Sequence, residues 1–417
     1  MEQELLQEYQ PEKALLISVD TGEFDAEASL NELAELTKSA GAVPAASLLQ
    51  KRPTPDAATC VGPGRLEEIR NYCENLSIQL LIFDRELSPT QIRNLERETD
   101  CRVIDRTTLI LDIFASRARS KEGKLQVELA QLKYLLPRLS GKGTSLSRLG
   151  AGIGTRGPGE SKLETDRRHI RRRIESLNKQ LLQVGKRREQ LRAHRRKIGV
   201  ITVALVGYTN AGKSTLMNLL TSAGVLAEDR LFATLDPTSR ALTLPNGMTV
   251  MLIDTVGLVR RLPHHLVEAF HSTLEEAALA DVILNVCDAS SPEASIHLEV
   301  TRKILEDLGC SNRPIISVMN KCDLIGFSGR LPPEENEVCI SAKTGEGISL
   351  LLESIQQHLP VQQKQVELLL PYDQGNLLGE IRRFGRLLSE EYREDGIYLS
   401  AMVDAKLYHR VREYRIG

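Results

Sequence analysis

The chain of 417 residues contains no tryptophan, and aromatic side chains make up only 4 % of it. This scarcity argues against a large aromatic platform for stacking the bases of single-stranded nucleic acid. The sequence also has no run of 18 apolar residues and no apolar core of a signal peptide. It therefore predicts a protein that neither spans a membrane nor is secreted. We expect a cytoplasmic monomer, and peripheral association with a membrane stays open.

The seven cysteines are odd in number and never spaced C-x-x-C, which argues against a disulfide framework and against a zinc site. We expect reduced, mostly buried thiols. The formal net charge of −2 points to no particular partner. A chain of this length with 41 % apolar residues can form about three domains with real cores.

The segment Gly207-Tyr-Thr-Asn-Ala-Gly-Lys-Ser214 matches the phosphate-binding pattern G-x-x-x-x-G-K-[ST]. It follows an apolar, β-branched run over 199–206 that predicts a buried strand, and it leads into a predicted helix. The free N–H groups at the start of such a helix bind phosphate. We expect Lys213 to reach the β- and γ-phosphates and the Ser214 hydroxyl to bind Mg²⁺.

A second segment, Asp254-Thr-Val-Gly257, closes a predicted strand over 249–253. This is how the aspartate that supports Mg²⁺ is presented in such a site, and the Gly257 N–H would meet the γ-phosphate. The next residue is Leu258, where many small GTPases carry a glutamine that orients the attacking water. An aliphatic side chain cannot orient water, so we expect slow hydrolysis that a partner or a rearranged loop accelerates.

Two later segments predict the choice of base. Asn320-Lys-Cys-Asp323 follows a predicted strand over 314–319, and Ser341-Ala-Lys343 follows one over 338–340. The Asp323 carboxylate can accept hydrogen bonds from guanine N1 and N2, where adenine has no donor. Because an unpaired buried carboxylate is costly, this residue should select GTP. The Ser341 segment would place a backbone N–H near guanine O6.

A GTPase also needs a threonine that closes on Mg²⁺ when the γ-phosphate is present. The loop between the first predicted helix and Asp254 offers Thr234, which we favour, and Thr238 as its competitor. The residues predicted to act in catalysis are Lys213, Thr234 and Gly257, and those predicted to bind the metal are Ser214 and Thr234. The residues predicted to bind the nucleotide are Gly207, Tyr208, Thr209, Asn210, Ala211, Gly212, Lys213, Ser214, Phe232, Ala233, Thr234, Leu235, Asp236, Asp254, Thr255, Val256, Gly257, Asn320, Lys321, Cys322, Asp323, Ser341, Ala342 and Lys343.

Upstream of these segments, strand-like and helix-like stretches alternate over about the first 115 residues, which predicts a small parallel α/β domain. The stretches are 14–19, 26–39, 80–83, 88–98 and 102–104. The glycine-rich Val61-Gly-Pro-Gly-Arg65 lacks a Lys-Ser pair, so we interpret it as a turn before a helix that starts near Leu66. Whether this domain binds a nucleotide of its own stays open.

Leucine and isoleucine then recur at steps of three and four on both sides of a loop over 140–159, which predicts an antiparallel helical hairpin. The loop holds seven glycines and no acidic residue, and residues 165–197 carry a net charge of +10. A charge run is usually a solvated helix face. Here the excess of one sign is large and lies beside the basic loop, which indicates contact with structured RNA.

After about residue 363, the strand-like runs 366–371 and 395–400 flank a predicted helix over 376–391. The predicted organisation is therefore an N-terminal α/β domain (1–118), a helical hairpin (119–197), a P-loop GTPase domain (198–361) and a small C-terminal α+β domain (362–417). The fold class is α/β. We expect the last domain to contact protein.

The sequence resembles the HflX family of ribosome-associated GTPases. The resemblance covers nearly the whole chain and rests on the segments 207–215, 231–238 and 254–257, on Arg-Thr-Thr-Leu-Ile-Leu-Asp-Ile-Phe-Ala (106–115) and on Gly-Thr-Arg-Gly-Pro-Gly-Glu (154–160). The last two are specific to the family rather than to GTPases in general. In the family, Ser214 and Thr234 match the Mg²⁺ ligands, and an aliphatic residue after Gly257 is usual.

The resemblance implies a Ras-like GTPase domain with a mixed, mostly parallel sheet. It also implies binding to the large ribosomal subunit and its rRNA, with the hairpin loop near the peptidyl-transferase centre. GTP hydrolysis to GDP and phosphate would be stimulated there and would serve the splitting or rescue of stalled ribosomes under stress. The alternative is a GTP-dependent switch that docks on another RNA or protein without splitting ribosomes. An accessory GTPase of RNA modification is a variant of that alternative.

Overall fold

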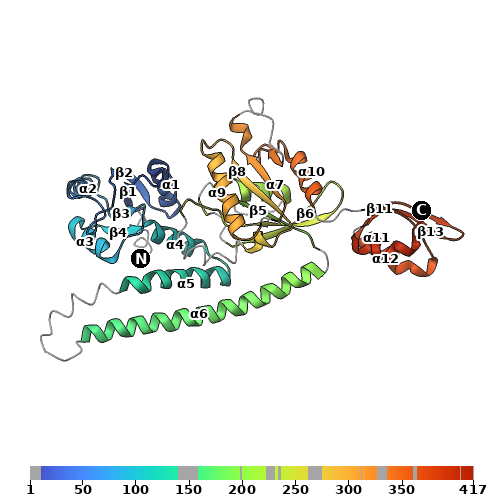
Figure 1. The fold of residues 1–417 in the computed structure, drawn as a ribbon, viewed down its shortest axis with the longest axis horizontal. Coiled ribbons are helices and arrows are strands. Elements are labelled where there is room, and N and C mark those ends of the chain that lie inside the picture. The colour runs from blue at the N-terminus through green and yellow to red at the C-terminus, as the bar shows by residue number, and fades with distance from the viewer. Residues whose placement is uncertain are drawn as a thin grey trace, which may run out of the picture. The chain divides into compact units, whose positions relative to one another are not determined.

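A computed structural model describes residues 11–139, 158–197, 200–221, 231–232, 236–261, 275–310, 312–325, 336–359, 364–403 and 405–416. The chain divides into two compact units, which are described separately. Unit 1 comprises Met1–His194, Leu226–Pro237 and Val256–Leu274, and unit 2 comprises Arg195–Val225, Thr238–Thr255 and Glu275–Gly417. Figure 1 shows the elements of both units, coloured along the chain.

Unit 1 contains the parallel α/β domain that the alternation of strand and helix predicts. Its four-stranded sheet has the order β2-β1-β3-β4, and each neighbouring pair is parallel. The strands are β1 (Lys13–Asp20), β2 (Val43–Lys51), β3 (Leu80–Phe83) and β4 (Arg102–Asp105), and the helices are α1 (Ala26–Ser39), α2 (Pro63–Leu76), α3 (Pro89–Thr99) and α4 (Arg106–Arg117).

Local sequence sets the starts of these helices. The side chain of Asp25 accepts a hydrogen bond from the N–H of Ala28 and caps α1. Ser88 and Gln91 form a reciprocal capping box at the start of α3. Such caps satisfy N–H groups that a helix start leaves without partners. The glycine-rich segment at 61–65 leads into a helix, as its sequence indicates, but α2 begins at Pro63 and not near Leu66, because proline is well suited to the first position of a helix.

Unit 1 also contains the hairpin. Helices α5 (Lys121–Arg138) and α6 (Pro158–Lys197) run antiparallel, because Glu128 pairs with Arg173 and the earlier Glu122 pairs with the later Arg188. Leu177 on α6 is fully buried between leucines of α5, as the heptad pattern predicts. The glycine loop at 140–157 lies outside the described residues.

A Leu177→Ala substitution should loosen α6 from α5, because the cavity that it leaves costs about 2–5 kcal/mol of stability. Hydrogen exchange of the backbone amides of both helices measures this, and faster exchange is expected around the substitution. Leu182→Ala is the matched control, because the Leu182 side chain is 67 % exposed and should leave the exchange unchanged. Equal effects of the two substitutions would contradict the packing.

Unit 2 contains a six-stranded sheet of order β10-β9-β8-β5-β7-β6, in which β6 alone runs antiparallel to its neighbour. The mixed, mostly parallel sheet is the one expected. Its strands are β5 (Thr202–Gly207), β6 (Thr238–Thr243), β7 (Thr249–Asp254), β8 (Val282–Asp288), β9 (Ile315–Asn320) and β10 (Glu337–Cys339), and its helices are α7 (Lys213–Thr221), α9 (Ala294–Asp307) and α10 (Ile348–His358).

The C-terminal part of unit 2 is a three-stranded antiparallel sheet of order β11-β13-β12. Its elements are β11 (Lys364–Leu370), α11 (Gly375–Phe384), β12 (Arg386–Arg393), β13 (Gly396–Val403) and α12 (Ala405–Val411). The helix predicted over 376–391 is wrong in its second half. The backbone becomes extended at Gly385, and the following residues pair with β13, so tertiary pairing overrides their helical pattern.

Among the helices of the described ranges, none combines the length and apolar character that crossing a membrane requires.

Candidate nucleotide-binding site

Three of the predicted segments meet at one edge of the six-stranded sheet. The parallel strands β5, β7 and β9 end at Gly207, Asp254 and Asn320. Neighbouring parallel strands end at the same edge of a sheet, and ligands of open α/β sheets bind there. The apolar run before each motif therefore has a definite role, because it delivers the polar residues that follow it to a common place.

The loop between β5 and α7 needs its two glycines. Gly207 has φ +152°, and a Cβ atom there would overlap the carbonyl of Val286 on the adjacent strand β8. Gly212 has φ +89°, and a Cβ atom there would overlap the side-chain amide of Asn320. Only glycine combines these backbone angles with so close an approach. The loop thus turns tightly and opens into the N-terminus of α7.

Lys213 is buried at the start of α7. Its Nζ donates hydrogen bonds to the carbonyl oxygens of Gly207 at 3.0 Å and Tyr208 at 2.7 Å. Burial lowers the pKa of the Lys213 amine to about 8, although the Asp254 carboxylate acts in the opposite direction. A nearby phosphate would favour the charged amine. The side chain is therefore held over the loop in which a phosphate would sit.

Ser214 and Asp254 form a pair of oxygen groups beside this lysine. The Ser214 hydroxyl donates to Oδ2 of Asp254 at 2.9 Å, and the Thr255 hydroxyl donates to the Leu205 carbonyl at 2.7 Å. A hydroxyl and a carboxylate are hard oxygen donors, which suit Mg²⁺. Within the described residues, no cluster of three or more His, Cys, Asp or Glu side chains could hold a metal by itself. The donor set therefore fits a magnesium ion that a phosphate also binds.

Asn320 links two of the predicted segments. It is 2 % exposed, its Nδ2 donates to the Ala211 carbonyl at 2.8 Å, and its Oδ1 accepts from the Ala342 N–H at 2.9 Å. The phosphate loop and the segment at 341–343 are thus tied by one amide side chain. The Ser341 hydroxyl also donates to Oδ1 of Asp323 at 2.7 Å, which orients that carboxylate.

The structure adds residues that the motifs do not point to. Asp288, at the end of β8, forms an ion pair with Lys321 at 2.7 Å. This pair helps to hold the segment 320–323 in place. The ring of Tyr208 stacks on His297 of α9, with centroids 3.9 Å apart. Asp288 could have been predicted to lie at a strand end, because it directly follows the mostly apolar stretch 282–287. The Tyr208 contact has no local signal, because α9 follows it by about 90 residues.

Other predicted residues belong to unit 1 or lie outside the described residues. Phe232, Asp236 and the stretch from Val256 to Gly257 pack within unit 1, and Ala233, Thr234 and Leu235 fall in a range that is not described. The competitor Thr238 begins strand β6 and pairs with Asp254 on β7.

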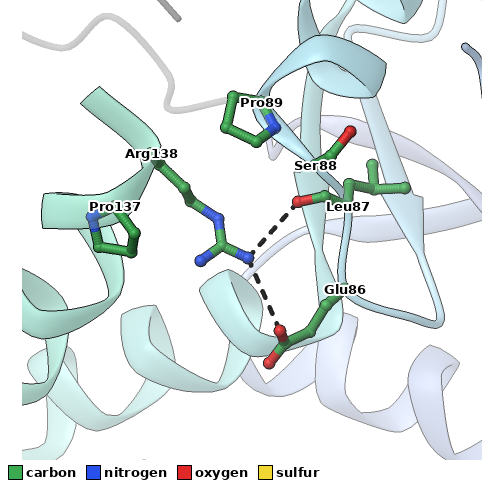
Figure 2. A pocket seen from close by; sticks show the side chains of 6 residues that line it. All are labelled: Glu86, Leu87, Ser88, Pro89, Pro137 and Arg138. Carbon is green, nitrogen blue, oxygen red and sulfur yellow. Dashed lines mark hydrogen bonds and ion pairs between the residues drawn. The ribbon is translucent and has the colours of Figure 1, made fainter. Parts of the chain in front are cut away.

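Unit 1 has a separate hollow of about 340 Å³ between the start of α3 and the end of α5. Figure 2 shows the Arg138 guanidinium in this hollow, directed at the Leu87 carbonyl and at the Glu86 carboxylate, with which it forms a 3.7 Å ion pair. The Arg138 guanidinium in this hollow therefore already has protein partners. None of the predicted nucleotide-binding residues lines the hollow.

Family models match most of the chain. Residues 27–115 match a model described as "GTP-binding GTPase N-terminal", residues 117–195 one described as "GTP-binding GTPase Middle Region", and residues 202–321 one described as "50S ribosome-binding GTPase".

Curated relatives match over nearly the full length. GTPase HflX of Lacrimispora saccharolytica is 50 % identical over 400 residues, which cover 95 % of this chain and 95 % of the relative. GTPase HflX of Caldanaerobacter subterraneus subsp. tengcongensis is 48 % identical over 407 residues, covering 97 % and 94 %. A crystal structure of a GTP-binding protein from Sulfolobus solfataricus in complex with GDP is 28 % identical with a TM-score of 0.45, covering 83 % of this chain and 98 % of that one. The chain belongs to the HflX family of GTPases, which bind GTP and hydrolyse it.

Proposed function

We propose that this GTPase binds the large ribosomal subunit through its rRNA, hydrolyses GTP slowly alone and faster on the ribosome, and takes part in splitting or rescuing stalled ribosomes under stress. The observation that carries the proposal is the exposed basic surface of helix α6, on the same chain as the nucleotide site. The description "50S ribosome-binding GTPase" of the model that matches residues 202–321 supports it.

In the proposed site, the N–H groups of the loop from Gly207 to Ser214 bind the phosphates, and Lys213 adds a positive charge. Asp323 accepts hydrogen bonds from the guanine, and Ser341 holds its carboxylate in place. Ser214 and Thr234 would hold Mg²⁺, supported by Asp254, and the ion would neutralise charge on the phosphates. The N–H of Gly257 would donate to the γ-phosphate.

Leu258 supports the proposal that hydrolysis is slow without the ribosome and faster on it. Its side chain is aliphatic and 2 % exposed, so it can neither donate a hydrogen bond to the attacking water nor accept one from it. A group that orients this water must therefore come from elsewhere. A ribosome-bound state that supplies or rearranges such a group would explain a low rate in isolation.

The basic surface of α6 consists of side chains that solvent reaches. Its exposed lysines and arginines are Arg168, Arg171, Arg172, Lys179, Lys186 and Arg187. Arg173, although exposed, donates from Nε and Nη2 to both carboxylate oxygens of Glu128 at 2.6 and 2.8 Å, so it belongs to the packing of the hairpin. The remaining exposed charges are available to a phosphate backbone.

Sedimentation with ribosomes tests the proposal. With a non-hydrolysable GTP analogue, the protein should sediment with the large subunit, and with GDP it should do so less. Absence from the large-subunit fraction in both nucleotide states would leave the alternative of a GTP-dependent switch for another RNA or protein. Light scattering of intact ribosomes then measures splitting directly.

Replacing Arg171 and Arg172 together by glutamine should weaken binding to the large subunit by about tenfold or more at 0.1 M salt, since each lost phosphate contact lowers the affinity and its salt dependence. The matched control replaces the exposed Lys51 and Arg97 of unit 1, which removes the same charge away from the hairpin. If the control weakens binding as much, net charge rather than α6 is responsible.

A further inference from the structure

The ring of Tyr208 stands at the start of the phosphate loop in unit 2 and is held by helix α9. Its plane lies 16° from that of the His297 imidazole, and the two ring centroids are 3.9 Å apart. Tyr208 is 5 % exposed, so this stack is part of the interior of the unit. Contact between two aromatic rings contributes beyond the area that it buries. The stack therefore ties the loop between β5 and α7 to a helix that comes much later in the chain.

Strand β8 fixes the position of His297. Helix α9 packs against β8 and β5, which Figure 1 shows. The Asn285 side-chain amide donates to the carbonyl oxygen of Leu298 at 3.4 Å, and the Cys287 thiol donates to that of Ala294 at 3.2 Å. Both donors come from β8 and are 1 % exposed, and both acceptors lie within one turn of His297 on α9. The imidazole therefore belongs to a helix that is anchored on the core of the sheet.

The same strand fixes the start of the phosphate loop. Gly207 pairs with Val286 of β8, and a Cβ atom at Gly207 would lie 2.0 Å from the Val286 carbonyl oxygen. The carbonyl oxygens of Gly207 and Tyr208 both accept hydrogen bonds from Nζ of Lys213. The first peptide groups of the loop are thus held by β8, by Lys213 and, through the Tyr208 ring, by His297.

We propose that His297 is a positioning residue for phosphate binding, because its stack on Tyr208 holds the loop 207–214 in the conformation that binds GDP and GTP. This inference rests on the proposed role of that loop. N–H groups bind a phosphate tightly when they already point to one place, since ordering them during binding costs affinity. Without the imidazole, one face of the Tyr208 ring loses its aromatic partner, and the loop samples more conformations.

Binding of fluorescent GDP and of a fluorescent, non-hydrolysable GTP analogue to the full chain tests this role. His297→Ala should weaken the binding of both nucleotides by about three- to tenfold, which is the value of one aromatic pair. His297→Phe should bind both nucleotides nearly as tightly as the wild type, because a phenyl ring restores the stack. Ile296→Ala is the matched control on the same helix. The Ile296 side chain is 51 % exposed, so its removal should leave both affinities unchanged.

Steady-state hydrolysis of GTP separates positioning from damage to the fold. The loop binds phosphates that the substrate and the transition state share, so a less ordered loop should raise KM and leave kcat unchanged. A partly unfolded sample would instead lose kcat at an unchanged KM. For His297→Ala we expect a KM for GTP that is about three- to tenfold higher, with kcat and the melting temperature close to those of the wild type.

The outcomes distinguish this role from the proposed function. If the wild-type chain binds neither nucleotide, the proposed phosphate site fails, and the role of His297 fails with it. If the wild type binds both and His297→Ala binds them equally well, the positioning role alone is overturned. A loss that His297→Phe does not restore also overturns it, since the 3.9 Å ion pair of His297 with Glu293 would then be the important contact. A lower kcat at an unchanged KM overturns it as well. Weaker binding of both nucleotides in His297→Ala, with recovery in His297→Phe, supports it.

Discussion

An Asp323→Asn variant should bind GTP at least about 100-fold more weakly than the wild-type chain, because a site built to pair with the donors of a base discriminates strongly when that pairing is lost. The amide of asparagine offers one acceptor and one donor where the carboxylate offers two acceptors. One of the two guanine donors would then face an N–H group. The Asn320 and Lys213 contacts of the pocket are independent of this change, so the phosphates can still bind.

Xanthosine triphosphate should recover much of the lost affinity, since xanthine carries a carbonyl acceptor at C2 that can meet the new amide donor. Competition against a fluorescent guanine nucleotide measures both affinities. Ser341→Ala is the matched control, because it removes the 2.7 Å hydrogen bond to Asp323 and keeps the carboxylate. Its affinity should fall by less than about tenfold, the value of one ordinary hydrogen bond. Unchanged GTP affinity in Asp323→Asn would remove this residue from the base site.

Arg106→Ala should destabilise unit 1 by about 3–5 kcal/mol, the cost of leaving buried charges without their partner. Arg106 is 3 % exposed at the start of α4, and it forms ion pairs with Asp84 at 2.8 Å and Glu32 at 2.5 Å. Its Nη2 also donates to the Arg260 carbonyl at 3.1 Å, and Glu32 accepts from the Arg260 N–H at 3.2 Å. The same cluster therefore holds the backbone that follows Gly257 and Leu258.

The deficit should shrink as the pH falls. Burial raises the pKa of Glu32 above its ordinary value, although Arg106 and Arg260 act in the opposite direction. Without Arg106 the pKa rises further, so Glu32 in the folded variant takes up a proton at a higher pH than in the unfolded chain and no longer needs a counter-charge. Denaturant unfolding near pH 8 and near pH 5 measures the difference.

Arg102→Ala provides the comparison for Arg106→Ala. Arg102 lies on strand β4 of the same sheet, and its 2.8 Å ion pair with Glu12 joins side chains that are 57 % and 45 % exposed. Such a pair is worth less than about 1 kcal/mol. Similar losses from the two substitutions would show that the buried cluster carries no special stability.

Much of the nucleotide site could be predicted because each of its motifs can be recognised from residues that are neighbours in the sequence. Each motif stands directly after an apolar, β-branched run, and parallel strands bring such strand ends to one edge whatever the loops between them do. The start of α1 at Ala26 and the bounds of β3 follow similarly from nearby residues. Strand β2 escaped prediction because Leu48 alone of its nine residues is buried, so the sequence there lacks the apolar run of a buried strand.

Other parts depend on contacts between distant residues. Glycine at 385 and the pairing of 386–393 with β13 decide the end of α11, and neither is visible in the helical pattern of that stretch. Arg106 meets the backbone of Arg260 across 154 positions of the chain. A motif can show that such an arginine is characteristic of a family, whereas only the folded chain shows that it holds the loop after Gly257.

The two hydrogen bonds of Asn320 have a consequence for the binding of separate fragments of the nucleotide. Because this one amide fixes both the Ala211 carbonyl and the Ala342 N–H, guanosine and pyrophosphate offered as separate fragments should each help the other to bind. Whichever fragment arrives first immobilises the amide for the second. A substitution of Asn320 should therefore weaken the binding of the base and of the phosphates together.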